Sequence, residues 1–174
     1  MIEMQTGELT TVLSTPWFKL MAKKVDNTPE PYYFVQSTDA VSVIAMTPEK
    51  KVILVQQYRP AIDSESLELP AGHLKDMETP EDAARRELLE ETGYLADKVE
   101  FLGVLYPNTT RIGHKLWCYF APNVIKAKEP ELREINKVIN CYQSELVEFI
   151  KAGKIKQALD IAAVFLGIQN NKLA

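Results

Sequence analysis

Three glutamates and an arginine stand close together in the chain, at spacings that bring carboxylates to one site. Glu87, Glu90 and Glu91 are three or four residues apart or adjacent, so on a helix they fall within an arc of roughly 100°. Like charges at such spacings repel by about 0.2–0.5 kcal/mol per pair. Arg86 offsets part of this repulsion, and a hard cation offsets it more fully, because Mg²⁺ prefers carboxylate oxygens, water and phosphate. The pattern therefore indicates a metal site that grips a diphosphate.

The element that must carry these carboxylates is a helix over residues 80–92. Thr79 is a suitable N-cap, a proline follows at the first helical position, and Gly93 is a suitable C-terminal stop. Ala84 and Leu88 flank the acidic arc, so we expect them to face a core.

The spacing around this helix resembles the Nudix box, a motif of fixed glycine, glutamate and arginine positions. The positions that match are Gly72, Glu78, Arg86, Glu87, Leu88, Glu90, Glu91 and Gly93. Tyr94 departs mildly from the pattern, because an aliphatic residue is more usual there. Residues 56–72, QQYRPAIDSESLELPAG, are similar to the ADP-ribose pyrophosphatase branch of this superfamily.

The resemblance implies an α/β fold: a Nudix α/β/α sandwich with a mixed β-sheet and an N-terminal β-rich segment. We expect that segment in residues 1–37 and the Nudix domain in residues 38–174. Alternation and β-branched residues predict strands at 32–36, 40–46, 51–57, 67–69, 99–105, 115–121 and 135–140. Further helices are predicted at 144–152 and from 155 to about 169.

The resemblance also implies roles for single residues. Metal ligands would be Glu87, Glu91, the main-chain carbonyl of Ala71 and, in support, Glu90. Arg86 would orient these carboxylates and Glu78 would accept its hydrogen bonds. In related enzymes the catalytic base comes from a loop after the box, here within residues 126–136. Glu134 matches that position best, Glu131 and Glu129 are alternatives, and Glu90 competes with all three.

Substrate contacts are expected just upstream of the box and in a later loop. Arg59 is suited to a phosphate through its fork of donors, or to a salt bridge at the rim, and Glu68 to a ribose hydroxyl or the metal site. Arg111 lies where the family places a substrate loop. The run at 107–111 differs from the family's usual one, which leaves nucleoside diphosphate sugars other than ADP-ribose open.

The composition of the chain limits the partners and the compartment that we expect for the protein. The formal charge of −4 argues against binding to a nucleic-acid polymer or an anionic membrane. No apolar run approaches the roughly 20 residues of a membrane span, and no signal-peptide pattern is present. Cys118 and Cys141 do not form a metal-type cluster, so we expect buried free thiols and a cytoplasmic protein. Members of this branch are commonly homodimers, and Trp17 and Phe18 would either pack that interface or stack on a nucleobase.

The leading hypothesis is Mg²⁺-dependent hydrolysis, with Mn²⁺ as an alternative ion, of ADP-ribose or another nucleoside diphosphate sugar. The products would be a nucleoside monophosphate and a sugar phosphate. Two alternatives stay open, a house-cleaning nucleoside triphosphate pyrophosphatase and a non-catalytic module that senses a nucleotide.

Overall fold

A computed structural model of the chain describes residues 7–26, 28–131 and 135–173. The chain divides into two compact units. One combines the N-terminal residues through Asp39 with Tyr106–Lys115, and the other combines Ala40–Leu105 with the chain from Leu116 onward. Each unit is held together by its own internal contacts.

The first unit is built on an antiparallel three-stranded sheet in the order β1-β2-β3. Its strands are β1 (Leu9–Ser14), β2 (Lys19–Lys23) and β3 (Tyr32–Gln36). Pro29 and Pro31 lie in the connection between the last two strands. The strand expected at residues 32–36 is confirmed, and β3 also bridges to Ile112 of the later segment.

The second unit holds a mixed sheet in the order β7-β4-β10-β9. Its strands are β7 (Ala71–His73), β4 (Ala40–Ala45), β10 (Leu116–Ala121) and β9 (Glu100–Leu105). β4 and β10 run parallel, and the other pairs are antiparallel. A second sheet has the order β12-β5-β6, with β12 (Ile135–Tyr142), β5 (Lys51–Arg59) and β6 (Ser64–Glu68), and a short 3-10 turn η1 (Pro60–Ile62) joins the last two. A small ribbon pairs β11 (Ile125–Lys126) with β8 (Tyr94–Leu95).

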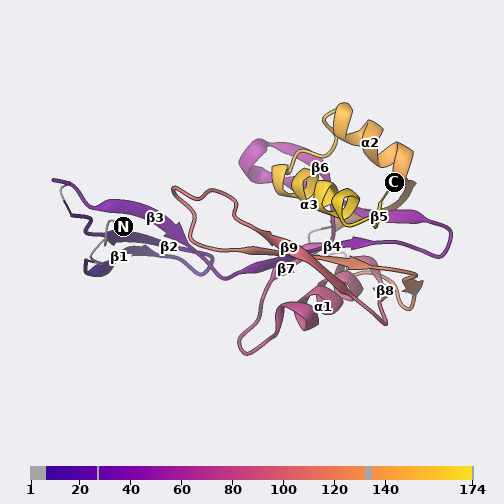
Figure 1. Cartoon of the computed structure of the whole chain (residues 1–174), viewed down its shortest axis with the longest axis horizontal. Coiled ribbons are helices and arrows are strands. Elements are labelled where there is room, and N and C mark those ends of the chain that lie inside the picture. Colours follow the sequence, from indigo (N-terminus) through magenta and orange to yellow (C-terminus); the bar gives the residue numbers. More distant parts are fainter. Residues whose placement is uncertain (1–6, 27, 132–134, 174) are drawn as a thin grey trace. The chain divides into compact units, whose positions relative to one another are not determined.

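Helices α1 (Pro80–Thr92) and α3 (Ala158–Gln169) lie on opposite faces of the mixed sheet, and α2 (Gln143–Lys151) lies on the α3 side (Figure 1). The alternation of β4 explains this arrangement, because successive side chains of a strand point to opposite faces. Val43 packs in the apolar cluster of α1 with Leu88, whereas Ile44 packs in the cluster of α3 with Val164. The α/β/α sandwich expected from the sequence is confirmed.

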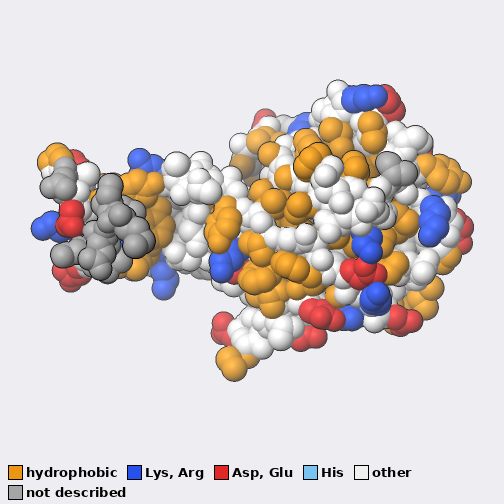
Figure 2. Space-filling view, viewed as in Figure 1, with side chains coloured by type: hydrophobic (Ala, Val, Ile, Leu, Met, Phe, Trp, Pro, Cys, Tyr) orange, Lys and Arg blue, Asp and Glu red, His pale blue; other side chains and the backbone are white. Residues whose placement is uncertain are grey.

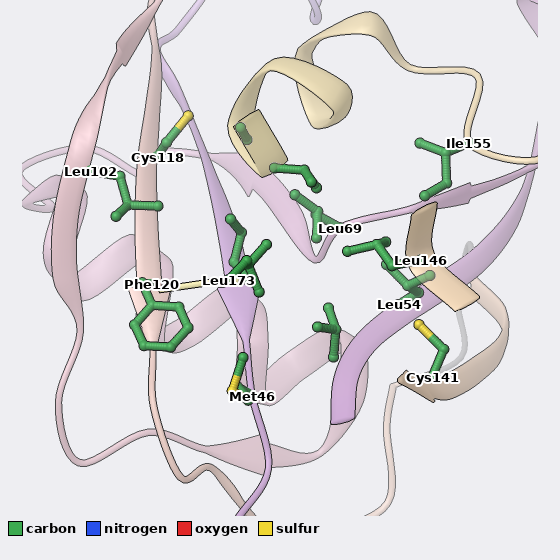
Figure 3. Packing of buried hydrophobic residues seen from close by; sticks show 14 of the residues in the cluster. Met46, Leu54, Leu69, Leu102, Cys118, Phe120, Cys141, Leu146, Ile155 and Leu173 are labelled. Carbon is green, nitrogen blue, oxygen red and sulfur yellow. The ribbon is translucent and has the colours of Figure 1, made fainter. Parts of the chain in front are cut away.

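The larger apolar cluster joins both sheets to α2 and α3. Figure 3 shows Leu54 of β5 and Leu146 of α2 close to Leu69, with Phe120 of β10 and Leu173 also in the cluster. Leu54, Leu69 and Leu146 are each at most 1% exposed. This core fixes β5, β6 and the residues that follow β6, and thereby the chain leading into β7.

Helix α3 carries a carboxylate on its buried face and apolar side chains on its exposed face. Its buried stripe consists of Asp160, Ala163, Val164 and Gly167, at helical spacing. On its other side Ile161, Phe165 and Ile168 remain exposed, and apolar side chains are visible across the face of this unit that carries α3 (Figure 2). The buried stripe therefore contains a carboxylate, while apolar side chains stay on the surface.

Most predicted boundaries agree with the structure to within two residues, and two shift by three residues. The helix predicted at 80–92 is confirmed in full. The helix expected from residue 155 begins at Ala158, and the strand expected at 67–69 is β6, which ends at Glu68. Cys118 and Cys141 are free and buried, as expected. Across the described part of the chain, no helix is long and apolar enough to cross a membrane.

Candidate active site

The acidic helix α1 is fixed at both ends by local hydrogen bonds. The Thr79 hydroxyl accepts from the amide of Asp82 at 3.2 Å. At the other end, Gly93 adopts φ 73° and its N–H donates to Leu89 O at 3.0 Å, a conformation that glycine tolerates better than other residues. Ala84 and Leu88 are fully buried, so the rotation of the helix about its axis is set by the core.

The first carboxylate of this helix lies directly against the edge strand β7. A Cβ atom at Gly72 would stand 2.2 Å from the carboxyl carbon and from Oε1 of Glu87. Only glycine therefore leaves room for this side chain, whose exposed fraction is 13%. Burial raises the pKa of Glu87 above its ordinary value, and the neighbouring Arg86 guanidinium opposes that rise.

Arg86 connects the acidic residues to each other and to β7. Its Nε and Nη2 donate to Glu78 at 2.6 and 2.7 Å, and Nη1 donates to Glu87 at 2.6 Å and to Glu90 at 3.3 Å. Nη2 also donates to the carbonyl of His73 at 3.0 Å. The hydrogen bonds from Arg86 lower the pKa of Glu78 to about 2. One guanidinium thus fixes the orientation of three carboxylates.

Glu91 points from the same helix to the start of β7. Its Oε2 accepts from the amide of Ala71 at 3.0 Å. Burial raises the pKa of Glu91 to about 8, the Ala71 amide opposes this rise, and the charge of Glu87 adds to it. Because two carboxylates are partly desolvated and near each other, a bound cation would stabilise both.

The carbonyl of Ala71 points to the same edge of β7 as its amide. Pro70 O accepts from the amide of Val43 at 2.9 Å, and the register pairs Gly72 with Val41. In an antiparallel ladder the residue between two hydrogen-bonded pairs turns both its N–H and its C=O away from the partner strand. Ala71 is that residue, so its carbonyl lies on the free edge of β7, beside the acidic helix.

The carboxylates of α1 and the Ala71 carbonyl suit a Mg²⁺ ion that takes only some of its ligands from the protein. Within residues 7–26, 28–131 and 135–173, no three His, Cys, Asp or Glu side chains are grouped tightly enough to hold an ion by themselves. Arg86 holds Glu87 and Glu90 toward itself, and Glu91 is turned to the Ala71 amide. Mg²⁺ commonly binds one or two carboxylates and takes its remaining ligands from water and substrate phosphates. The arrangement is therefore that of a partial site which a phosphorylated ligand completes.

The two predicted substrate residues upstream of the box contact each other. Arg59 donates to Glu68 through Nε at 2.9 Å and through Nη2 at 2.5 Å. Gln57 donates to Glu68 at 3.0 Å. Glu68 is only 4% exposed, whereas 42% of the Arg59 side chain is exposed. Both charges act on the pKa of Glu91, so the pair borders the acidic helix.

Arg111, the third predicted substrate residue, belongs to the other unit. Its Nη1 donates to the carbonyl of Tyr33 at 2.8 Å. Its guanidinium lies over the ring of Tyr32, with Cζ 4.4 Å from the ring centroid. These contacts hold Arg111 against β3, and its role toward a substrate stays a prediction.

One candidate base, Glu90, lies on α1, and the others lie in the later loop at residues 126–136. Glu134 lies outside the described residues. The amide of Glu131 donates to Glu90 O at 2.8 Å, and its carboxylate is paired with Lys128 at 2.8 Å. Glu129 is almost fully exposed, with 93% of its side chain accessible. The structure thus attaches the loop to the C-terminal part of α1, next to Glu90.

Two features of the site were missed by reasoning from the sequence. The box glycine Gly72 was recognised by its position, but the contact with Glu87 that excludes a side chain was not. Gln57 was not assigned a role, although it holds the buried carboxylate of Glu68. A signal for Gln57 exists in retrospect, since it is a polar residue within an apolar strand, where it is 4% exposed.

Comparisons with known proteins find similarity over most of the chain. The family model described as NUDIX domain matches residues 36–156. The methanol dehydrogenase activator of Bacillus methanolicus is 32% identical over 133 residues, covering 75% of this chain and 72% of that protein. The ADP-ribose pyrophosphatase of Bacillus subtilis is 28% identical over 131 residues, covering 75% and 71%. The mouse ADP-sugar pyrophosphatase is 51% identical over a shorter stretch of 69 residues, which covers 37% of this chain and 32% of the mouse protein.

A solved structure shares the fold. The crystal structure of an ADP compounds hydrolase superposes with a TM-score of 0.81 at 18% identity, covering 97% of this chain and 94% of that one. At this level of identity the similarity supports the architecture alone.

Proposed function

The chain belongs to the Nudix family of hydrolases, and we propose a substrate class for it. The proposed reaction is cleavage of the diphosphate linkage of ADP-ribose or a related nucleoside diphosphate sugar. The products would be a nucleoside monophosphate and a sugar phosphate. The names of the two pyrophosphatase relatives support this class of substrate. The unusual run at residues 107–111 is the reason to keep sugars other than ribose in the proposal.

The observation that carries the proposal is the placement of two α1 carboxylates against the free edge of β7. Glu87 fits against Gly72, and Glu91 meets the amide of Ala71. These two carboxylates and the Ala71 carbonyl would hold Mg²⁺, or Mn²⁺ in its place, with Glu90 in support. The bound ion would neutralise the diphosphate and lower the pKa of a coordinated water.

Other residues would orient the carboxylates or accept the proton of the attacking water. Arg86 would keep Glu87 and Glu90 in place through the hydrogen bonds it already makes. As water attacks phosphorus and the bridging P–O bond breaks, a carboxylate must accept the proton of that water. We propose Glu134 for this role, with Glu131 and Glu90 as competitors. Arg59 would bind a phosphate oxygen and Glu68 would anchor Arg59.

The experiment is a screen of nucleotide sugars and nucleoside triphosphates with Mg²⁺, resolved by chromatography. Glu91→Gln should lower kcat by at least about 100-fold on the preferred substrate, the scale expected when charge stabilisation is removed from an active site. Glu81→Gln is the matched control, because Glu81 lies on the same helix in an exposed ion pair with Arg85. It should keep activity close to that of the wild type.

Other outcomes of the same screen would replace the proposal. Release of pyrophosphate from triphosphates alone would assign a house-cleaning triphosphatase. Tight nucleotide binding by calorimetry without turnover in Mg²⁺ would assign a sensing module. Equal activity of the wild type and Glu91→Gln would remove the proposed metal site.

We also propose that residues 1–37 contribute to a homodimer and that residues 38–174 form the catalytic domain. The support is the exposure of large apolar side chains in the N-terminal sheet. Val12 and Leu13 of β1 are 54% and 53% exposed, and Trp17, in the connection between β1 and β2, is 77% exposed. Light scattering at micromolar concentration should give a dimer mass, and Val12→Asp should shift it to that of a monomer. A monomeric wild type would contradict this assignment.

A further inference from the structure

A carboxylate faces the core from an otherwise apolar helix. Asp160 is 3% exposed and lies on the buried stripe of α3 with Ala163 and Val164. The adjacent residue Ile161 is 37% exposed. The helix therefore buries the acidic side chain and leaves the neighbouring apolar side chain partly in solvent. Because burying a carboxylate is unfavourable unless it is hydrogen-bonded, this orientation needs a specific partner.

The partner is the main chain of Leu69. Oδ2 of Asp160 accepts from the Leu69 amide at 3.1 Å. Leu69 lies between β6 and β7, which belong to different sheets. It is 1% exposed and belongs to neither strand, so its amide finds no place in a ladder. A buried amide without an acceptor is unfavourable, and the hydrogen bond to Asp160 satisfies this one.

The chain passes from one sheet to the other between β6 and β7, and this crossing is flanked by residues of the candidate site. Glu68, which holds Arg59, ends β6, and Ala71, which meets Glu91, begins β7. Only Leu69 and Pro70 separate them. The carbonyl of Pro70 accepts from the amide of Val43 at 2.9 Å. The crossing therefore has two anchors, one from the central strand β4 and one from α3.

We infer that Asp160 is a positioning residue of the candidate active site, which acts by fixing the Leu69 amide and thereby the Ala71 carbonyl and the Glu68 carboxylate. The inference rests on the proposed function, because it assigns Asp160 to the same metal site. α3 lies on the face of the mixed sheet opposite α1 (Figure 1). Asp160 thus supports the site from behind the sheet, without contact to a ligand.

Two substitutions of Asp160 distinguish the effect of its hydrogen bond to the Leu69 amide from the effect of its charge. Asp160→Asn keeps an oxygen acceptor for the Leu69 amide and removes the charge. Burial raises the pKa of Asp160 to about 7, so near neutral pH part of the population is already uncharged and the Asn variant is a mild change. Asp160→Leu removes the acceptor while keeping a side chain of similar size.

A third variant controls for loss of stability alone. Val164→Ala truncates a buried side chain on the same stripe of α3 and should lower the Tm by about 2–10 °C. It leaves the hydrogen bond to Leu69 in place. The probes are Mn²⁺ binding measured by electron paramagnetic resonance, amide hydrogen exchange of residues 68–72, and steady-state kinetics, each on the full chain.

Asp160→Leu should weaken Mn²⁺ binding by about 10-fold or more, the usual scale for removing a group that orients a metal ligand. Exchange in residues 68–72 should accelerate, and kcat should fall more than KM rises. Asp160→Asn should restore Mn²⁺ affinity to near the wild-type value, and Val164→Ala should keep it despite a lower Tm.

Unchanged Mn²⁺ affinity and exchange in Asp160→Leu would overturn the inference. So would an equal loss of affinity in Asp160→Leu and in Val164→Ala at matched Tm. A wild type that binds no Mn²⁺ would overturn both the inference and the proposed metal site. A wild type that binds Mn²⁺ but hydrolyses no nucleotide would overturn only the proposed function, and the comparison of variants would still decide the role of Asp160.

Discussion

The carboxyl group of Glu87 occupies the space that a side chain at Gly72 would need, with Oε1 2.2 Å from the position of a Cβ atom. Gly72 of β7 and Glu87 of α1 are therefore in direct contact, and each limits the size of the other's side chain. This contact sets how closely the helix approaches the strand, and with it the distance between the helix carboxylates and the Ala71 carbonyl.

Gly72→Ala should therefore displace the Glu87 carboxylate and weaken Mn²⁺ binding by about 10-fold or more. Overpacking at this contact should also cost about 1–3 kcal/mol of stability. Titration with Mn²⁺ and urea unfolding measure the two effects. In the double variant Gly72→Ala/Glu87→Ala the clash is gone, so stability should recover while metal affinity does not. Full metal affinity in Gly72→Ala would refute this account.

Arg86→Lys should lower kcat by about 10-fold even though the charge is retained, because a single ammonium cannot reproduce a planar fork of donors. Glu78, Glu87 and the carbonyl of His73 all depend on that fork. Arg85→Lys is the matched control, since Arg85 is the preceding residue on the same helix and pairs with the exposed Glu81. Steady-state kinetics should show a loss in the first variant only.

The raised pKa of Glu91 predicts a pH dependence of the metal-free protein. The carboxyl has an ordinary value of 4.5 and a folded value of about 8, so in this window the folded state holds a proton that the unfolded state has lost. Stability should therefore fall as pH rises from 4.5 to about 8, and stay level above it. Glu91→Gln should flatten this part of the profile in urea unfolding. A wild-type profile that rises across the window would contradict the assignment.

The same ionisation predicts proton release when a metal binds. At pH 7 Glu91 is largely protonated, because its pKa is about 8, and a carboxylate ligand must be deprotonated. Calorimetry of Mn²⁺ binding in buffers of different ionisation enthalpy should show a proton released per protein. The release should disappear in Glu91→Gln, and a buffer-independent heat in the wild type would count against this residue as a ligand.

Gly93→Ala should detach the loop that follows β11 from the end of α1. A Cβ atom there would stand 2.0 Å from Lys128 O, and φ is 73°, a conformation that costs a non-glycine residue about 1–2 kcal/mol. The Gly93 carbonyl accepts from the amides of Ala127 and Lys128 at 2.8 and 3.1 Å. Faster amide exchange in residues 126–131 and a lower kcat should follow, with Mn²⁺ affinity little changed.

The helix and its acidic face could be predicted from the sequence because their determinants are local. Thr79, Gly93 and the spacing of Glu87, Glu90 and Glu91 lie within one short segment, and a helix fixes the relative directions of its own side chains. A similar reason applies to the strands that were predicted, which are β3, β4, β5, β6, β9, β10 and β12, since alternation is visible within a few residues. These local patterns were sufficient to identify the family.

Contacts between distant segments could not be predicted. The Leu69 amide and Asp160 are 91 residues apart in sequence, and no local pattern connects a lone aspartate of an apolar helix with that amide. The pairing of Arg59 with Glu68 depends on how β5 and β6 lie side by side. From the sequence, Arg59 stayed open between a phosphate and a salt bridge at the rim, and Glu68 between a ribose hydroxyl and the metal site.

The parallel pairing of β4 with β10 also constrains the order of events during folding. The cluster under α1 contains Val41 and Val43 of β4 together with Tyr119 and Ala121 of β10. On a growing chain the acidic helix is complete at Gly93, before β10 has been synthesised. Contacts between distant segments form slowly because a long loop must close first. Until residue 121 has been synthesised, the apolar side of α1 lacks its contacts with β10, and transiently uncovered apolar surface of this kind promotes aggregation.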